Sequence, residues 1–250
     1  MNSQITSKLE VNLLDAKTTP QLISDFAIKH KVPAIVTSPE YVAPLIAHRA
    51  VMGGGYKIIC ALDFPKGANY AMDKLFRANP DFVGADGFEI LLSDGKTEVE
   101  SKNELKAIHS YLKANRALVD IRWCLRMHTV DEVRTRGILK NMKLFPPSFV
   151  RIDPHLETPR ADVEKMKAQV ALIQEFVPYP IKISGNVNAA MIKELQDIRG
   201  VKRFDVSMKQ AEAIAHELKL TARALLPEST TPTKKGPAVK QVGTAGRIRI

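Results

Sequence analysis

The chain has 250 residues, of which 45% are hydrophobic and 26% are charged; these ordinary globular values exclude wholesale disorder. No apolar run approaches the roughly 20 residues that span a bilayer, and Met1–Ser7 lacks the pattern of a signal peptide, so we expect no membrane partner. The net charge of +10 is compatible with binding to nucleic acid or to an acidic protein surface, but it is also a common solubility device.

Eight short apolar segments follow one another along the chain, and each is predicted to be a strand. In chain order they are Val11–Leu14, Ala34–Thr37, Lys57–Leu62, Gly87–Leu92, Ala117–Ile121 or slightly beyond, Phe149–Ile152, Ile181–Ser184 and Arg203–Val206. Helical patterns lie between them, and such crossovers allow consecutive strands to run parallel.

Helix starts follow four of the predicted strands. They are marked by the residues Thr19-Pro20, Ser38-Pro39, Thr158-Pro159 and, before Ala189–Leu195, by Asn188. A strand that is repeatedly followed by a helix start is the arrangement found at the top of a (β/α)8 barrel, which typically needs about 250 residues. We therefore predict one TIM-barrel domain over residues 1–226.

The two cysteines, Cys60 and Cys124, lie in or next to predicted strands, without a C-x-x-C spacing, and are interpreted as buried thiols. His128 and His155 lie near the ends of the fifth and sixth predicted strands. No His-x-His or His-Glu-x-x-His spacing supports a metal site, so we expect neither a metal nor a cofactor.

Several strand ends, taken together, resemble the deoxyribose-phosphate aldolases, a family of class I aldolases with a TIM barrel. The segment Lys57–Gly67 is similar to an apolar strand that ends in Phe-Pro-His-Gly in that family. Similarity to the first, second, fourth and seventh strand ends is carried by Leu14–Thr19, Ala34–Val42, Gly84–Ile90 and Ile181–Asn188. The resemblance extends from about residue 12 to residue 218.

The resemblance implies a set of catalytic positions. In that family a lysine of strand six forms a Schiff base with an aldehyde, a lysine of strand seven supports it, and an aspartate of strand four relays protons. The corresponding residues are Arg151, Lys182 and Glu89, with Asp15 in the opening aspartate-containing turn. Arginine stays protonated and offers no free amine, so Arg151 cannot form the Schiff base.

Lys182 has two interpretations. Beside Arg151 it could lose its proton more easily and become the nucleophile itself. Alternatively, it forms an ion pair with Glu89, Asp15 or Asp153 across the barrel mouth. Glu89 is correspondingly either a proton shuttle or a structural partner.

The resemblance also implies a phosphate site in the turns after strands seven and eight. Gly185 and Ser207 match the family, whereas Asn186 adds a side chain where close approach is needed. Asp205 would place a negative charge beside the phosphate and repel it. We therefore predict a degraded phosphate site.

Residues 227–250 differ from the barrel in composition and are predicted to be a separate tail. They have no hydrophobic period and carry a net charge of +4, with the basic residues Lys234, Lys235, Lys240, Arg247 and Arg249. The final residues 246–250 alternate polar with apolar, as an added edge strand does. We expect this tail to bind another protein chain or, alternatively, nucleic acid through its lysines.

Two functions remain open from the sequence. The first is a non-catalytic pseudoenzyme, a structural or assembly component that the tail joins to an oligomer, a virion or another large particle. The second is a class I carbon–carbon lyase with its Schiff base on Lys182 and a small aldehyde or a sugar phosphate as substrate. The departures at Arg151, Asn186 and Asp205 favour the first. We expect a cytoplasmic location or one within a virion or large assembly.

Overall fold

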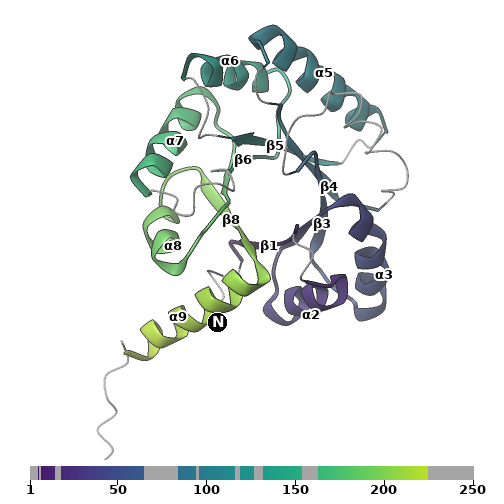
Figure 1. The fold of residues 1–250 in the computed structure, drawn as a ribbon, viewed down its shortest axis with the longest axis vertical. Helices are drawn as coiled ribbons and strands as arrows, with labels where there is room; N and C mark the ends of the chain where they lie inside the picture. The colour runs from purple at the N-terminus through teal and green to yellow at the C-terminus, as the bar shows by residue number, and fades with distance from the viewer. Residues whose placement is uncertain are drawn as a thin grey trace, which may run out of the picture.

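Eight described strands, hydrogen-bonded in sequence order from β1 to β8 and back to β1, close into a parallel barrel. In the computed structural model, residues 5, 7–14, 18–64, 84–93, 96–115, 119–126, 132–153 and 163–224 are described. The strands surround the centre and the helices lie outside them (Figure 1). The predicted (β/α)8 fold is confirmed.

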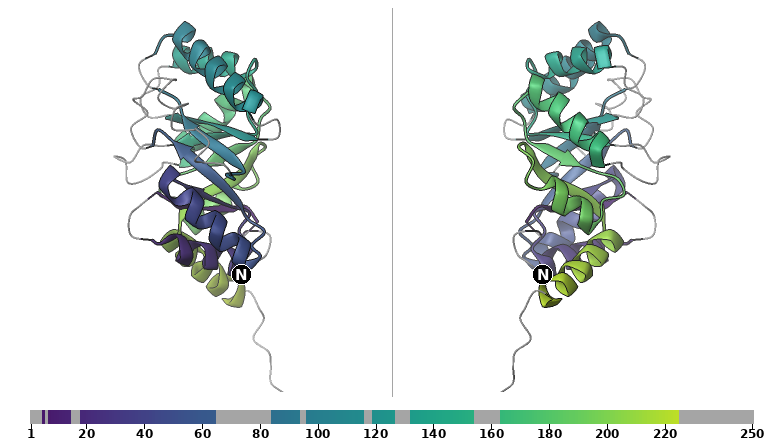
Figure 2. Two further views of the ribbon diagram at one scale, coloured as in Figure 1. Left: turned by 90° about the vertical axis from the view of Figure 1, so that its right-hand side faces the viewer. Right: turned by 90° about the vertical axis from the view of Figure 1, so that its left-hand side faces the viewer.

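The strands and helices alternate along the chain. The strands are β1 (Leu9–Leu13), β2 (Ala34–Thr37), β3 (Lys57–Leu62), β4 (Gly87–Leu91), β5 (Asp120–Arg126), β6 (Phe149–Asp153), β7 (Ile181–Ile183) and β8 (Val201–Ser207). The helices are α2 (Pro20–His30), α3 (Val42–Met52), α5 (Glu98–Asn115), α6 (Glu132–Met142), α7 (Val163–Phe176), α8 (Ala189–Leu195) and α9 (Met208–Ala224). The two side views of Figure 2 show these helices packed around the strands.

Two of the predicted helix caps are present. Thr19 Oγ1 accepts a hydrogen bond from the Leu22 amide at 3.3 Å, and Asn188 Oδ1 accepts one from the Met191 amide at 2.9 Å. Ser38, by contrast, makes no side-chain cap and precedes a 3₁₀ turn, η1 (Pro39–Tyr41), before α3 begins. Thr158 and Pro159 lie outside the described residues.

The prediction for the fifth strand is wrong in its position. The strand was expected from residue 117 to residue 121 or slightly beyond, but β5 begins at Asp120 and ends at Arg126. The reason is that the inward positions of β5 carry Arg122 and Arg126, both buried, so an apolar run does not mark this strand. Because charged residues of β5 face the barrel interior, the hydrophobicity pattern does not show where this strand begins and ends.

Alternate residues of each strand face opposite sides of the sheet. One set packs between the strands and the helices, and the other set fills the inside of the barrel. The outward-facing residues are apolar and pack against the helices; they include Val11, Ile35, Ile58, Phe88, Trp123, Ile152 and Phe204. A second, small apolar cluster consists of Ala34, Val36, Ile59 and Ala61 from β2 and β3. Most inward-facing residues of the other strands are polar or charged.

Gly87 shows how tightly β4 and β5 approach each other. A Cβ atom at this position would lie 2.5 Å from the backbone oxygen of Asp120 and 2.6 Å from its Cβ. Only glycine fits here without a shift of the backbone, and this close approach brings Glu89 of β4 beside Arg122 of β5.

Cys60 and Cys124 are free and buried, as predicted. Burial raises the pKa of the Cys60 thiol to about 12. None of the described helices is both long and apolar enough to cross a bilayer.

Candidate functional site

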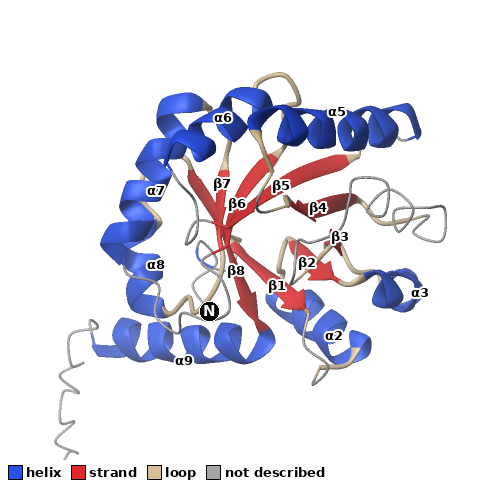
Figure 3. Ribbon diagram, turned by 45° about the horizontal axis from the view of Figure 1, so that its top comes forward, coloured by secondary structure: helices blue, strands red, loops and turns tan. Residues whose placement is uncertain are grey.

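Six charged side chains meet inside the barrel, and we call them the interior charge cluster. They come from β1, β4, β5, β6, β7 and β8, which surround one centre in Figure 3, and they are Glu10, Glu89, Arg122, Arg151, Lys182 and Asp205. Each of these residues, counted with its backbone, is at most 4% exposed. TIM-barrel interiors are usually filled by branched aliphatic side chains, so this interior is unusual.

Glu89 lies at the centre of the interior charge cluster. Its Oε1 accepts a hydrogen bond from Arg151 Nη1, and its Oε2 forms an ion pair with Lys182 Nζ. Arg122 Nη1 lies 3.9 Å from the same Oε2. One carboxylate therefore contacts three cations from three different strands.

Glu10 and Arg122 belong to this site, although the sequence analysis did not select either of them. Glu10 Oε2 accepts hydrogen bonds from Arg122 Nη1 at 2.6 Å and from Lys182 Nζ at 3.1 Å. Arg122 Nη2 also donates to Asp120 Oδ2 at 3.0 Å. A sequence signal for both existed: Glu10 and Asn12 alternate with apolar residues in Leu9–Leu13, and three charged residues and Cys124 do so in Asp120–Arg126.

The structure corrects the expectation for Asp205. Its carboxylate does not face a phosphate turn but lies inside the barrel, where Arg151 Nη2 is 3.1 Å from Oδ2 and Asn12 Nδ2 donates at 3.3 Å. Lys182 Nζ is 3.9 Å from Oδ1. Asp205 faces inward because it alternates along β8 with Phe204 and Val206, which pack in the outer core.

The pKa values of the two glutamates in the interior charge cluster are lowered. Burial alone would raise the pKa of Glu10, but Arg122 and Lys182 outweigh it and lower the pKa to about 2. The pKa of Glu89 is likewise lowered, because Lys182, Arg151 and Arg122 outweigh the effect of burial. Both glutamates therefore carry a negative charge at neutral pH.

The pKa of Lys182 is raised, in contrast to the lowered value that a nucleophilic amine needs. Burial favours the neutral amine, but the carboxylates of Glu89, Glu10 and Asp205 outweigh burial. The interpretation of Lys182 as an ion-paired lysine is supported for Glu89, whereas Asp15 and the Asp153 side chain lie outside the described residues. Glu10 is a second partner of Lys182.

The aromatic ring of Phe64 covers part of Arg151. The guanidinium carbon lies 4.7 Å from the ring centroid, a cation–π contact, and the Arg151 side chain is 5% exposed. Phe64 directly follows the end of β3 and Asp63, whose φ of 68° turns the chain. Arg151 is thus hydrogen-bonded to Glu89 and covered on one side by Phe64.

The turns after β7 and β8 are bridged by Gln210. Its Oε1 accepts a hydrogen bond from the Ser207 amide at 2.8 Å, and its Nε2 donates to the Gly185 carbonyl at 3.1 Å. The Gln210 amide in turn donates to Ser207 Oγ at 3.3 Å, which completes a capping box at the start of α9. The Ser207 amide, which the resemblance assigns to phosphate, therefore already has a partner.

Several predicted site residues are not placed with the interior charge cluster. Asn186 has an exposed side chain in the turn after β7, and Gly185 adopts a φ of 101° there. Asp15 and all tail residues lie outside the described residues. Among the described residues, no group of three or more histidine, cysteine, aspartate and glutamate side chains is arranged to hold a metal, and His128 and His155 are outside them.

The closed parallel barrel with its outer helices defines a TIM barrel. No model of a known protein family matches the chain, and no curated protein matches it in sequence. Solved structures, however, match it along most of their length. They share the barrel fold at low sequence identity.

Three of these structures are aldolases. The deoxyribose-phosphate aldolase from Aeropyrum pernix is 15% identical, with a TM-score of 0.74 over 87% of this chain and 92% of that one. An aldolase named QR15 is 17% identical, with a TM-score of 0.70 over 88% of this chain and 98% of that one. The YdjI aldolase from Escherichia coli K12 is 11% identical, with a TM-score of 0.55 over 90% of this chain and 84% of that one. The chain therefore has the fold of the deoxyribose-phosphate aldolases.

Proposed function

We propose that this protein is a non-catalytic barrel with the aldolase fold, a structural or assembly component whose tail, residues 227–250, binds another protein chain. The observation that supports a non-catalytic barrel is the charge state of Lys182. Its amine is fully buried, is bonded to Glu10 and Glu89, and has a raised pKa. A protonated amine has no lone pair with which to attack a carbonyl carbon.

Two further observations support the same proposal. Arg151 occupies the position that the resemblance assigns to the Schiff-base lysine, and its guanidinium is bonded to Glu89 and Asp205. The Ser207 amide donates its hydrogen bond to Gln210 Oε1. The amine and the phosphate contact that an aldolase of this family would need are therefore both engaged within the protein.

Borohydride trapping tests whether an amine of this barrel forms a Schiff base. After incubation with acetaldehyde and reduction, we expect no ethylated peptide containing Lys182, because the amine is protonated and enclosed. Peptide mapping by mass spectrometry reads the result, and the Aeropyrum pernix enzyme serves as the positive control. The Arg151→Lys variant is expected to remain unmodified at position 151, since Glu89 and Asp205 would hold the new ammonium in its charged form.

A specific adduct at Lys182, together with acetaldehyde release from deoxyribose phosphate that is lost in Lys182→Ala, would establish the lyase alternative instead. Surface lysines that react slowly with acetaldehyde provide an internal reference within the same spectrum. Only an adduct at Lys182 that exceeds this reference counts against the proposal.

Deleting residues 227–250 tests the tail. These residues hold too little apolar surface to offset an ordering entropy of about 1–2 kcal/mol per residue, so they are not expected to stabilise the barrel. We expect an unchanged free energy of unfolding in urea and a loss of self-association measured by light scattering. A truncated chain that unfolds, or that assembles as the full chain does, contradicts the role of the tail.

A further inference from the structure

Six basic side chains lie at the end of the barrel where the strands begin, and we call them the basic arc. They belong to the starts of β8, β1 and β3 and to the turns before β8 and β2, and they are Lys8, Lys31, Lys57, Arg199, Lys202 and Arg203. The segments 7–9, 31–33, 53–57 and 196–203 that carry them contain one acidic residue, Asp197. These segments therefore have a net charge of +5, although Glu10 Oε1 lies 3.7 Å from Arg203 Nε and Asp120 Oδ2 lies 3.7 Å from Lys57 Nζ.

The basic arc is continuous because β8, β1, β2 and β3 are neighbours in the barrel. The Phe204 amide donates to the Lys8 carbonyl at 2.8 Å, and Arg203 Nη1 donates to the Ser7 carbonyl at 2.6 Å, which joins β8 to the start of β1. The Lys57 amide donates to the Pro33 carbonyl at 2.9 Å, which joins the start of β3 to the turn that contains Lys31.

Three members of the basic arc have no ionic partner within the described part of the chain. Lys31, Arg199 and Lys202 are exposed and form no ion pair with another described residue. Lys57 is 60% exposed at its side chain and lies 3.7 Å from Asp120 Oδ2. Lys31 is the C-cap of α2, where a cation is favoured, but Lys57, Arg199 and Lys202 lie away from helix C-termini.

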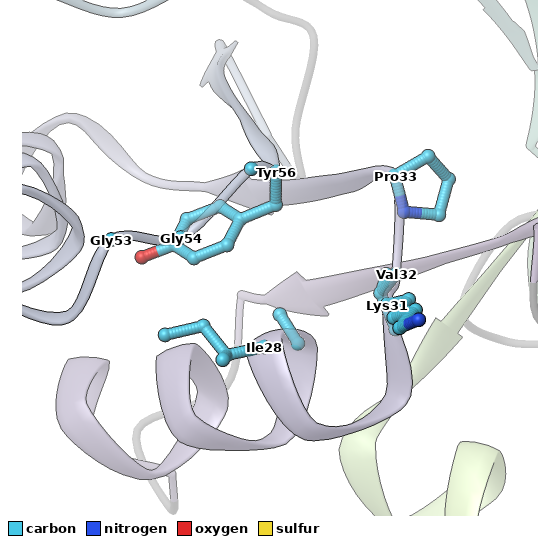
Figure 4. A pocket seen from close by; sticks show the side chains of 9 residues that line it. Ile28, Lys31, Val32, Pro33, Gly53, Gly54 and Tyr56 are labelled. Atoms are coloured by element: carbon cyan, nitrogen blue, oxygen red, sulfur yellow. The ribbon is translucent and has the colours of Figure 1, made fainter.

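A surface hollow of about 300 Å³ opens beside Lys31 in the same arc (Figure 4). Ile28, Pro33 and Tyr56 line it together with the turn Gly53–Gly55. A Cβ atom at Gly53 or Gly55 would meet no atom within 4 Å, so this turn leaves open space above its backbone. An extended ligand can therefore approach the main chain closely between Lys31 and Lys57.

The helix α9 ends at the same end of the molecule. It starts after the end of β8, packs against β8 and β1, and returns to the end of the barrel where the strands begin (Figure 2). The described chain thus ends at the end of the barrel that carries the basic arc.

We infer that the basic arc binds the sugar–phosphate backbone of a nucleic acid. The chemistry is that of phosphate neutralisation by lysine and arginine, which needs no base-specific contact. An acidic protein surface is less well matched, because the hollow beside Lys31 is open and the basic arc contains no exposed aromatic anchor. This inference is independent of the proposed function, since it rests on the exposed cations Lys31, Arg199 and Lys202, and neither on the charge state of Lys182 nor on a protein contact of the tail.

Fluorescence anisotropy with a labelled duplex and a labelled single strand tests the inference on the full chain. With about six phosphate contacts, affinity is expected to fall about a thousandfold between about 50 and about 200 mM salt. The triple variant Lys31→Asn, Arg199→Gln and Lys202→Gln should roughly halve the slope of log affinity against log salt. It should weaken binding at least tenfold at the lower salt; asparagine retains the left-handed φ of 54° at position 31.

The matched control removes three exposed lysines from the outer faces of α5 and α7, through Lys102→Gln, Lys106→Gln and Lys165→Gln. It changes the net charge equally and should bind as the wild type does. Equal losses in the two triple variants, binding that salt does not weaken, or no binding at all would overturn the inference. So would polyglutamate that displaces the probe better than unlabelled duplex, which would indicate an acidic protein instead. Unchanged unfolding midpoints show that both variants are folded.

Discussion

Replacing Glu89 with alanine is expected to lower the free energy of unfolding by about 3–5 kcal/mol, the usual cost of removing one partner from a buried ion pair. Glu89 is fully buried and contacts Arg151, Lys182 and Arg122. Without it, three cations remain inside the barrel with fewer carboxylates, and none of them can reach water. Urea unfolding followed by circular dichroism at neutral pH measures the loss.

The matched control is Glu164→Ala, which removes a surface carboxylate from its ion pair with Lys167 and should change stability little. A second control is the double variant Glu89→Gln with Lys182→Met, which removes one positive and one negative charge together. It should be more stable than Glu89→Gln alone, because the excess buried positive charge is gone. If Glu89→Ala unfolds at the urea concentration of the wild type, the interior charge cluster does not stabilise the barrel.

The protein is expected to lose stability steeply as the pH falls from about 4.5 to about 2. Glu10 has its pKa lowered to about 2 in the folded protein from an ordinary value of 4.5. It therefore binds a proton more readily when unfolded, and its stabilising contribution is complete above about pH 4.5 and lost as the pH falls through 2. The shift corresponds to about 3 kcal/mol for this one group. Glu89 acts in the same direction.

Asp205 acts in the opposite direction. Burial raises its pKa, an effect that Arg151 and Lys182 only partly offset, so the folded protein favours its protonated form. Its contribution to stability therefore falls as the pH rises above its ordinary range. The pKa values of two glutamates are lowered, whereas that of one aspartate is raised. The folded protein is therefore still expected to be more stable at neutral pH than at acid pH.

Free energies of unfolding measured in urea at neutral pH and at several pH values down to about 2.5 test this dependence. The Glu10→Gln variant should be less stable than the wild type at neutral pH, and its stability should fall less between pH 4.5 and 2.5. A Glu10→Gln curve parallel to that of the wild type would show that Glu10 does not titrate with a lowered pKa.

The interior charge cluster also explains which parts of the site could be read from the sequence. A resemblance to an aldolase site points to Glu89, Arg151 and Lys182, and the structure brings these three together. Glu10 and Arg122 carry no such resemblance. Their importance depends on contacts between β1, β5 and β7, which are distant in sequence and meet only when the barrel closes.

The sequence by itself determined the barrel, because eight apolar segments alternating with capped helices have few other ways to bury their apolar faces. It also determined the absence of an amine at residue 151, which is a property of the side chain alone. Tertiary structure decided the charge state of Lys182 and the direction of Asp205. A pKa depends on burial and on the charges within a few ångströms, and for Lys182 those charges come from β1, β4 and β8.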